Sequence, residues 1–501
     1  MNENTDNAIE SPGGLLPRLA ARPRTFRSTA LAVASAMFMQ QLDSTVLTVA
    51  LPTMARDLGV AAPTLSLALT SYLVALALFI PASGTLADRF GSRIVFCLSI
   101  AIFLIGSIAC AMAFNLPSLV AARFLQGIGG AMMVPVGRLV VLRSVDRSEI
   151  VQALSWLVMP ALIGPILGPP LGGMIVTWVD WRWIFYINVP IGLAGIVFAL
   201  ILVPNVHGVR TRFDWIGFVL SGAALACILF GLELSSRSGT GSVAVALLAG
   251  GSLLAAAYLV HARRTDSPIL NPALLRTKNF RLSVIAGSLA RITQGAQPFL
   301  LPLMFQLGFG YSAAVTGTLT VSVAIGGLAM KALAPRILRR WGFRRSLIVS
   351  GLVGTAGYAL CSAFRPDWPI PLIVAVLLVA GFFTSFQFTA YNAIAYADID
   401  DKRMSSATSF YATFQQLSMS LGICLAATTL ELTPRVAGRT TLSLDDFTMA
   451  FLVVTCISGC ALIWNRRFSS NAGRELNGGS SASSSPQEEI SALRDVAQTR
   501  R

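Results

Sequence analysis

The strongest constraint on this chain is a series of fourteen apolar stretches, each long enough to cross about 30 Å of lipid hydrocarbon as a helix. Nearly every stretch is apolar throughout, whereas the strands of a membrane β-barrel alternate apolar and polar residues over about ten positions. The sequence therefore predicts an all-α integral membrane protein with fourteen transmembrane helices. The stretches run approximately over 29–50, 65–87, 94–115, 118–141, 150–177, 184–204, 214–235, 241–262, 280–305, 312–334, 346–365, 369–394, 404–430 and 447–465.

The composition agrees with a lipid environment. Of the 501 residues, 54% are hydrophobic and 12% are charged, where soluble domains carry about 25% charged residues. A soluble protein of this composition would expose large apolar patches to water, so we expect a lipid bilayer around it. The net charge of +15 alone is compatible with nucleic-acid binding, but Lys and Arg lie mainly between the apolar stretches and form no compact basic domain. We expect no nucleic-acid partner.

Lys and Arg are unevenly divided between the two sets of connecting segments. Fourteen spans place both termini on one side, and the segments of that side hold 24 of these cations. The opposite segments hold six, which are Arg56, Arg182, Arg237, Arg365, Arg435 and Arg439. The positive-inside rule then predicts a multi-pass protein of the inner (cytoplasmic) membrane with both termini in the cytoplasm. The first 28 residues do not resemble a cleavable signal peptide.

A short motif occurs twice in the chain, 251 residues apart. Residues 84–93 read GTLADRFGSR and residues 335–344 read PRILRRWGFR, with two arginines, a glycine and a preceding aromatic residue in common. Such a repeat predicts two related halves joined by an inserted helix pair. The expected organisation is a cytoplasmic tail (1–28), an N-terminal six-helix half (29–204), an inserted hairpin (214–262), a C-terminal six-helix half (280–465) and a disordered cytoplasmic tail (469–501).

The reactive residue types do not form an enzyme or a metal site. The seven cysteines lie almost wholly within apolar stretches, and the two histidines, His207 and His261, lie at the edges of loops. No loop combines a nucleophile, a base and groups that stabilise an oxyanion, and the sequence contains no phosphate-binding loop. We expect no enzymatic activity, no metal and no cofactor.

The first copy of the repeated motif resembles the cytoplasmic signature of the major facilitator superfamily. Its motif residues are Gly84, Asp88, Arg89, Gly91 and Arg93. We expect glycines to permit a tight turn between helices 2 and 3, where an ion pair of Asp88 latches the two halves in one state. An ordinary positively charged loop is the alternative. The second copy carries Arg rather than Asp at the matching position, so the latch is in doubt there.

Two further segments resemble motifs of the same superfamily. Arg123 and Gln126 share one face of helix 4 with a glycine-rich run, and a charged Arg in hydrocarbon is expected to face a cavity or a partner. Snorkelling to the membrane surface is the alternative. Helix 5 resembles the antiporter motif of proton-driven exporters and predicts a kinked helix that seals against helix 8 (241–262) or its neighbours; small-residue packing alone is the alternative. Its motif residues are Gly164, Pro165, Gly168, Pro169, Gly172 and Gly173.

Helix 1 and the start of helix 6 narrow the resemblance. Residues 42–52 read LDSTVLTVALP and residues 181–192 read WRWIFYINVPIG. Both segments are similar to those of the fourteen-helix drug:proton antiporter branch (EmrB/QacA-type), although Thr48 replaces the usual Asn. The resemblance covers about residues 28–467 and implies a secondary transporter that exports small molecules in exchange for protons.

Asp43 is the only acid that the sequence places deep within a span. A medium of low dielectric favours the neutral form of a carboxyl, and a nearby cation favours its charged form. Asp43 and Arg123 are therefore the predicted proton-coupling pair, with the two side chains close together in one state only. The alternative is that Asp43 only hydrogen-bonds one helix to another.

The polar residues of the helices predict a substrate cavity but leave the substrate open. The candidate cavity residues are Gln40, Gln126, Arg291, Gln294 and Gln415. Family resemblance favours lipophilic, often cationic drugs, whereas one buried acid and at least two arginines at membrane depth favour organic anions or metal-chelate-like anions. A receptor or sensor that does not transport is a further alternative. The expected partners are a small-molecule substrate, protons and lipid; a periplasmic adaptor stays open.

Overall fold

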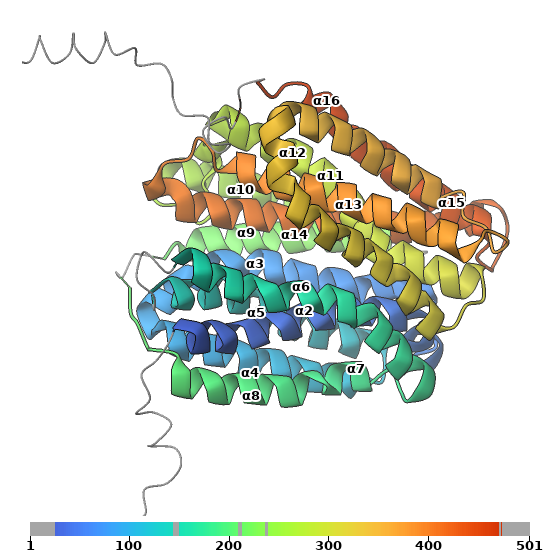
Figure 1. Cartoon of the computed structure of the whole chain (residues 1–501), viewed down its shortest axis with the longest axis horizontal. Helices are drawn as coiled ribbons and strands as arrows, with labels where there is room; N and C mark the ends of the chain where they lie inside the picture. The colour runs from blue at the N-terminus through green and yellow to red at the C-terminus, as the bar shows by residue number, and fades with distance from the viewer. Residues whose placement is uncertain (1–25, 144–149, 209–212, 236–238, 470–471, 473–501) are drawn as a thin grey trace, which may run out of the picture.

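The computed structural model describes residues 26–143, 150–208, 213–235, 239–469 and 472 (Figure 1). These residues are mostly helical, and they include no β-strand. The two predicted tails, 1–28 and 469–501, lie outside the described residues apart from 26–28, 469 and 472.

The first part of the chain folds into long helices over the predicted stretches. Their bounds are α2 (Phe26–Asp57), the short η1 (Ala62–Leu65), α3 (Ser66–Phe90), α4 (Ser92–Ala111), α5 (Leu116–Arg143), α6 (Ile150–Trp178), the short α7 (Trp183–Tyr186) and α8 (Asn188–Leu202). The predicted inserted pair corresponds to α9 (Trp215–Ser235) and α10 (Gly241–Arg264).

The second part of the chain also consists of long helices joined by short elements. Its elements are the short η2 (Pro272–Arg276), α11 (Lys278–Leu303), the π-helix η3 (Met304–Gly308), α12 (Ala313–Cys361), α13 (Ile370–Ala395), α14 (Asp401–Val436), α15 (Leu444–Gly459) and α16 (Ala461–Asn465).

Ten helices of the described chain are long and apolar enough to cross a membrane. The sequence predicts fourteen spans, and features of α2, α6, α11 and α12 account for the lower number. Polar side chains lower the hydropathy of α2 and α11, and the side chains of α6 are described only from Leu162 onward. Helix α12 runs through two predicted stretches, 312–334 and 346–365. The number fourteen therefore stays a prediction.

Both copies of the repeated motif bend the chain at a glycine. Gly91 separates α3 from α4 with a φ of 94°, and Gly342 interrupts the helical geometry of α12 with a φ of 69°. A side chain with a Cβ rarely adopts such a φ. The Gly91 turn also packs closely against Asn205, whose Oδ1 accepts a hydrogen bond from the backbone N–H of Arg93 at 3.2 Å. Both copies of the motif therefore turn at the same motif position.

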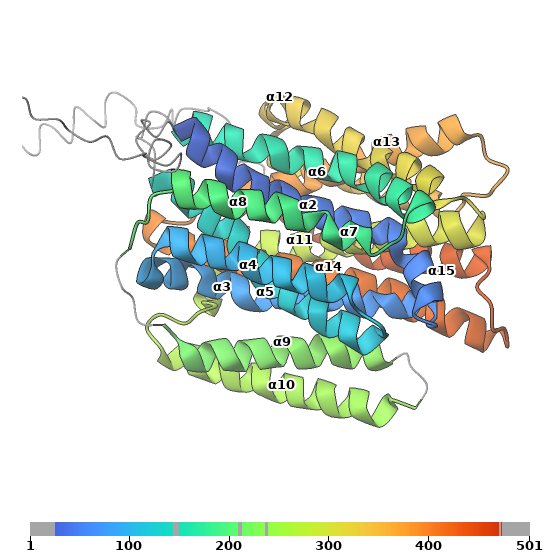
Figure 2. The ribbon, with the colours of Figure 1, turned by 90° about the horizontal axis from the view of Figure 1, so that it is seen from below.

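The helices form two groups that lie side by side, α2 to α8 in blue and green and α11 to α16 in yellow to red (Figure 1). Helix α6 packs against α12, α3 against α14, and α2 contacts α11. Helices α9 and α10 pack together as an outer pair (Figure 2), and α9 contacts both α3 and α14. The inserted pair thus contacts both groups.

Among the described residues, the two groups share one hydrophobic core, which lies toward one end of the molecule. On α2 the shared core includes buried residues from Leu42 to Ala55, and on α11 it includes residues from Ile292 to Leu303. Toward the start of α2, residues 30–39 belong to a core made by the first group alone. Toward the start of α11, residues 282–290 belong to cores that contain no residue of the first group. The molecule is therefore closed between its halves where α2 and α11 end, which we call the sealed end.

Candidate proton-coupling site

Asp43 and Arg123 form an ion pair in the interior of the first group of helices. The Arg123 Nη1 atom donates a hydrogen bond to Asp43 Oδ2 at 2.7 Å, and each side chain is 1% exposed. The guanidinium also lies 4.4 Å from the ring centroid of Tyr72 on α3, a cation–π distance. The structure thus brings together the two residues that the sequence predicts as a pair.

Neighbouring helices donate further hydrogen bonds to the carboxylate. Gln126 Nε2 on α5 and Asn188 Nδ2 on α8 each donate to Asp43 Oδ1 at 2.8 Å. Both amides also donate to the hydroxyl of Ser107 on α4, at 2.8 and 3.2 Å respectively. The charged form of Asp43 therefore receives donors from α5 and α8, with α4 holding those donors in place.

The two charges of the pair depend on each other. A buried ion pair is stable only while both charges and their hydrogen bonds remain in place, so the loss of either charge would leave the other one buried without its partner. Three buried polar atoms near the pair, Gln40 Oε1, Arg123 Nε and Asn188 Oδ1, make no hydrogen bond with the described residues. Unsatisfied atoms of this kind are uncommon in proteins.

The predicted cavity residues lie in two places. Gln126 belongs to the ion-pair cluster, and Gln40 lies beside Tyr72 at its margin. Gln294 on α11 donates to the backbone oxygen of Thr384 at 3.2 Å, and Gln415 on α14 is half-buried. The sequence interpretation did not assign a role to Asn188, although a buried amide in an apolar helix was a signal for one.

Arg291 on α11 is a buried cation in an aromatic environment. Its side chain is almost fully buried, and its Nη2 donates to the hydroxyl of Tyr411 at 3.1 Å. The guanidinium carbon lies 4.9 Å from the ring centroid of Tyr411 and 5.2 Å from that of Phe388. Within the described part of the chain, no carboxylate lies at ion-pair distance from Arg291, in contrast to Arg123.

The spacing of the internal repeat relates polar residues of α11 to polar residues of α2. The offset of 251 residues carries Gln40 onto Arg291 and Asp43 onto Gln294. Both pairs lie near the positions on α2 and α11 at which the separate cores end and the shared core begins. The acid Asp43 of the first group therefore matches an amide of the second group, and the cation Arg291 of the second group matches an amide of the first.

The glycines of α6 lie against two other helices. A Cβ at Gly164, Gly168 or Gly172 would meet residues 41–46 of α2, and one at Gly173 would meet the backbone of Ala313 on α12. Helix α6 packs chiefly on α2 and α12. The suggestion that it seals against helix 8 (α10) itself is wrong, because α10 packs on α9 at the outer edge of the bundle.

A second acid of the helices, Glu233, is placed by the sequence near the outer end of the 214–235 stretch, and the structure shows that it is buried. Glu233 lies near the end of α9 and is 3% exposed, and its carboxylate accepts a hydrogen bond from the hydroxyl of Ser66 at the start of α3. The residue lies far along the chain from Asp43, in the outer helix pair. Its burial reflects the packing of α9 against α3 and α14, which the apolar pattern alone does not reveal.

Comparison with known proteins places this geometry in a family. The sequence profile described as the Major Facilitator Superfamily matches residues 33–423. The chain belongs to this superfamily. The matched region includes Asp43, Arg123, the 84–93 motif and the glycines of α6, so the chain is a multi-pass membrane transporter.

Two curated members of similar length resemble the chain over most of its residues. "Probable transport protein HsrA" of Haemophilus influenzae is 36% identical over 448 residues, which cover 89% of this chain and 96% of the relative. "Putative multidrug resistance protein MdtD" of Cronobacter sakazakii is 38% identical over 411 residues, which cover 81% of this chain and 86% of the relative.

Solved structures of the superfamily share the fold at low identity. A D-xylose-proton symporter matches with a TM-score of 0.63 and 15% identity, covering 88% of this chain and 97% of the other. The POT family transporter PepTSo matches with a TM-score of 0.64 and 14% identity over the same shares. These likenesses concern the fold alone.

Proposed function

We propose that this transporter is a proton-coupled exporter of lipophilic drugs, of the fourteen-helix drug:proton antiporter branch. The observation that carries the proposal is the buried Asp43–Arg123 ion pair, held by donors from α5 and α8. The multidrug resistance named in the description of the MdtD relative supports drugs as substrates. In this proposal the protein spans the inner membrane fourteen times, with both termini in the cytoplasm.

The proton acts on the contact between α2 and α5. While Asp43 is charged, Arg123 and Gln126 hold α2 against α5. A proton that enters from outside neutralises Asp43 and weakens the ion pair, and the two helices can then shift. Release of that proton to the cytoplasm restores the pair. A ligand or proton shifts a conformational equilibrium only by its different affinity for the two states.

Alternating access follows from the way the two halves are joined. The sealed end corresponds to the periplasmic side in this proposal. Rocking of residues 29–204 against residues 280–465 would break the shared core and open the sealed end. Among the glycines of α6, Gly173 forms a close contact with Ala313 of the other half that the rocking changes, and the 84–93 loop with Asp88 is the cytoplasmic latch.

Two experiments test the proposal. Purified protein in sealed vesicles with an imposed pH gradient should move a fluorescent lipophilic cation such as ethidium against its concentration gradient, and collapse of the pH gradient should stop that movement. A reporter fused after Arg467 should lie in the cytoplasm, and one inserted in the 235–241 segment should lie in the periplasm. A cytoplasmic reporter in the 235–241 segment would contradict the proposed topology.

Organic anions are a second candidate substrate class. The observation in their favour is Arg291, a buried guanidinium whose polar partner is the neutral hydroxyl of Tyr411. A buried cation without a counter-charge is costly, and an anionic substrate would supply that charge. Competition of ethidium transport by organic anions, measured in the same vesicles, separates the two classes.

A further inference from the structure

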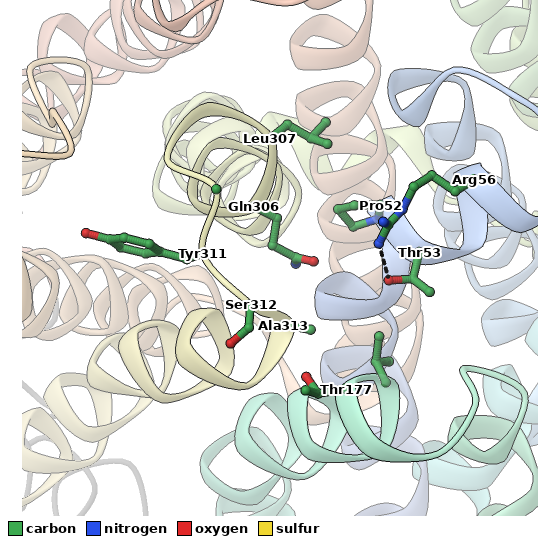
Figure 3. A pocket seen from close by; sticks show the side chains of 11 residues that line it. Pro52, Thr53, Arg56, Thr177, Gln306, Leu307, Tyr311, Ser312 and Ala313 are labelled. Carbon is green, nitrogen blue, oxygen red and sulfur yellow. Dashed lines mark hydrogen bonds between the residues drawn. The ribbon is translucent and has the colours of Figure 1, made fainter.

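A cavity of about 430 Å³ opens at the sealed end, away from the Asp43–Arg123 pair. Its volume lies in the range of small-molecule sites in proteins, which is about 300–1,000 Å³. Three segments surround it (Figure 3): the last turns of α2, the last turns of α6, and the chain that runs from η3 into α12. The cavity is therefore made by both halves of the transporter.

The lining carries one charge, and that charge is positive. Arg56 in the last turn of α2 is the only ionisable cation among the eleven lining residues, which include no Asp or Glu. Thr53 Oγ1, at 3.3 Å from Arg56 Nη2, is its only hydrogen-bond partner in the described chain, so other N–H groups of the guanidinium remain available. The N-terminus of α12, which begins at Ala313, adds positive potential beside the cavity.

The remaining lining combines neutral polar and apolar groups. Gln306, Thr177 and Ser312 supply amide and hydroxyl groups, and Pro52, Val176 and Leu307 supply apolar surface. Figure 3 shows Arg56 and Thr53 on α2 facing Gln306 across the cavity. Gln306 belongs to the π-helix η3, a type of helix that is frequent at functional sites.

The cavity depends on contact between the halves. Gln306 Nε2 donates to the backbone oxygen of Val49 on α2 at 2.9 Å, and the Ala314 N–H donates to Thr177 Oγ1 on α6 at 3.1 Å. Beside it, a Cβ at Gly317 would meet the backbone of Pro169. Separation of the halves at this end would break these contacts and pull the walls apart.

We propose that this cavity is a second binding site, for a small organic carboxylate with an apolar body. The carboxylate binds Arg56, the apolar body lies against Pro52, Val176 and Leu307, and the bound molecule touches both halves. Such a ligand binds the sealed conformation in preference to the open one, so it slows transport. This site is distinct from the proposed proton-coupling pair and acts on the conformational step.

The binding test uses three probes of nearly the same shape and different charge: benzoate, benzamide and benzylamine. Full-length protein in nanodiscs of zwitterionic lipid is titrated with each probe, and binding is followed by calorimetry. Benzoate should bind with at least tenfold higher affinity than the neutral and cationic probes. Arg56→Gln should raise the dissociation constant of benzoate at least tenfold, while Arg56→Lys should retain part of the affinity.

Arg365→Gln is the matched control, since Arg365 is a cation outside the cavity that donates to the backbone oxygens of Ser362 and Phe364. The affinity of the Arg365→Gln variant for benzoate should equal that of the unmodified protein. Equal binding of benzoate and benzamide, or unchanged benzoate affinity in Arg56→Gln, would overturn the proposal. If Arg56→Gln fails to fold, Leu307→Trp, which fills the cavity, must abolish benzoate binding for the proposal to stand.

A transport assay then tests the effect on conformation. Benzoate added on the side of the sealed end should reduce ethidium flux. In Arg56→Gln, the benzoate concentration that halves the flux should be at least tenfold higher. The result of the calorimetric binding experiment does not depend on proton coupling or on whether drugs are the substrates. Binding without inhibition would overturn the conformational role, whereas absent ethidium flux would contradict the proposed function and leave the binding result intact.

Discussion

Asp43 and Arg123 are 80 residues apart in the sequence, and their side chains meet at 2.7 Å inside one half of the molecule. The ion pair lies among α3, α4, α5 and α8, and donors from two of these helices also reach the carboxylate. A change in the charge of one carboxyl therefore alters the contacts of α2 with several neighbours at once. In the proposed mechanism, this connection couples protonation of Asp43 to the packing of the first half.

Removal of the Asn188 amide should change the pH dependence of transport. Asn188 Nδ2 donates to the charged carboxylate of Asp43, and a hydrogen bond to a charged group contributes about 1.5–3 kcal/mol. Asn188→Leu removes this donor from the carboxylate that the proposal assigns to proton transfer. The pH profile of ethidium flux should therefore differ from that of the unmodified protein.

Thr70→Val is the control for Asn188→Leu, because the buried Thr70 hydroxyl donates to the backbone of its own helix. Its pH profile should match that of the unmodified protein. An unchanged profile in Asn188→Leu, with protein correctly folded, would show that the amide does not affect the proton site.

The contact between α6 and α2 should not tolerate an added methyl group at Gly168. A Cβ there would overlap the side chain of Thr45, and overpacking typically costs about 1–3 kcal/mol. Gly168→Ala should lower the melting temperature and the flux. Gly250→Ala in α10 is the control, since a Cβ there meets open space, and it should be neutral or stabilising by up to about 1 kcal/mol. Equal melting temperatures would contradict the close packing.

The 84–93 loop provides a test of the proposed latch. Asp88→Asn should slow transport severalfold while the protein remains folded and inserted, because the substitution removes charge at the contact that changes between states. Asp266→Asn is the control, as Asp266 is an exposed acid in the 265–271 segment. Flux through Asp88→Asn equal to that of the control would reduce the motif to an ordinary charged loop.

Arg291→Gln distinguishes the two substrate classes. If the substrate is anionic, the loss of the guanidinium should abolish transport or raise KM, because an unpaired anion in the cavity costs several kcal/mol. If it is a lipophilic cation, transport should be unchanged or faster. The measurement is initial flux of an organic anion and of ethidium by the same preparation. Retained anion transport by Arg291→Gln would exclude this residue as the anion site.

The sequence predicted local features well and contacts between distant segments less well. The 214–235 stretch became α9 over Trp215–Ser235 because the thickness of the hydrocarbon layer sets the length of an apolar run. The Asp43–Arg123 pair was also predictable, since a buried cation needs a partner. The bond from Asn188 to Asp43 spans 145 residues, and no local pattern contains it.

Two other features depend on tertiary packing in the same way. The glycine spacing of α6 predicts close packing but does not name α2 and α12 as the partners. The cavity at the sealed end combines Arg56, Thr177 and Gln306 from separate helices. Each of these residues is unremarkable in its own stretch, and only the fold brings them together.

Substitutions at Asp43 and Arg123 test whether the pair acts as one unit. Asp43→Glu should retain partial activity with a shifted pH optimum, because the carboxyl is kept and displaced. Arg123→Ala should impair the same step, and the double variant with Asp43→Asn should be no worse than Asp43→Asn alone. Additive defects in the double variant would mean that the two residues act separately.

The central claim is that Asp43 carries the coupling proton. The most direct measurement is uphill ethidium transport by Asp43→Asn in sealed vesicles under an imposed pH gradient, with downhill exchange measured in the same preparation. Asn fixes the neutral form, so uphill transport should vanish while ethidium binding or downhill exchange survives. Uphill, proton-dependent transport by Asp43→Asn would contradict the claim and would make the buried Glu233 the next candidate for the proton carrier.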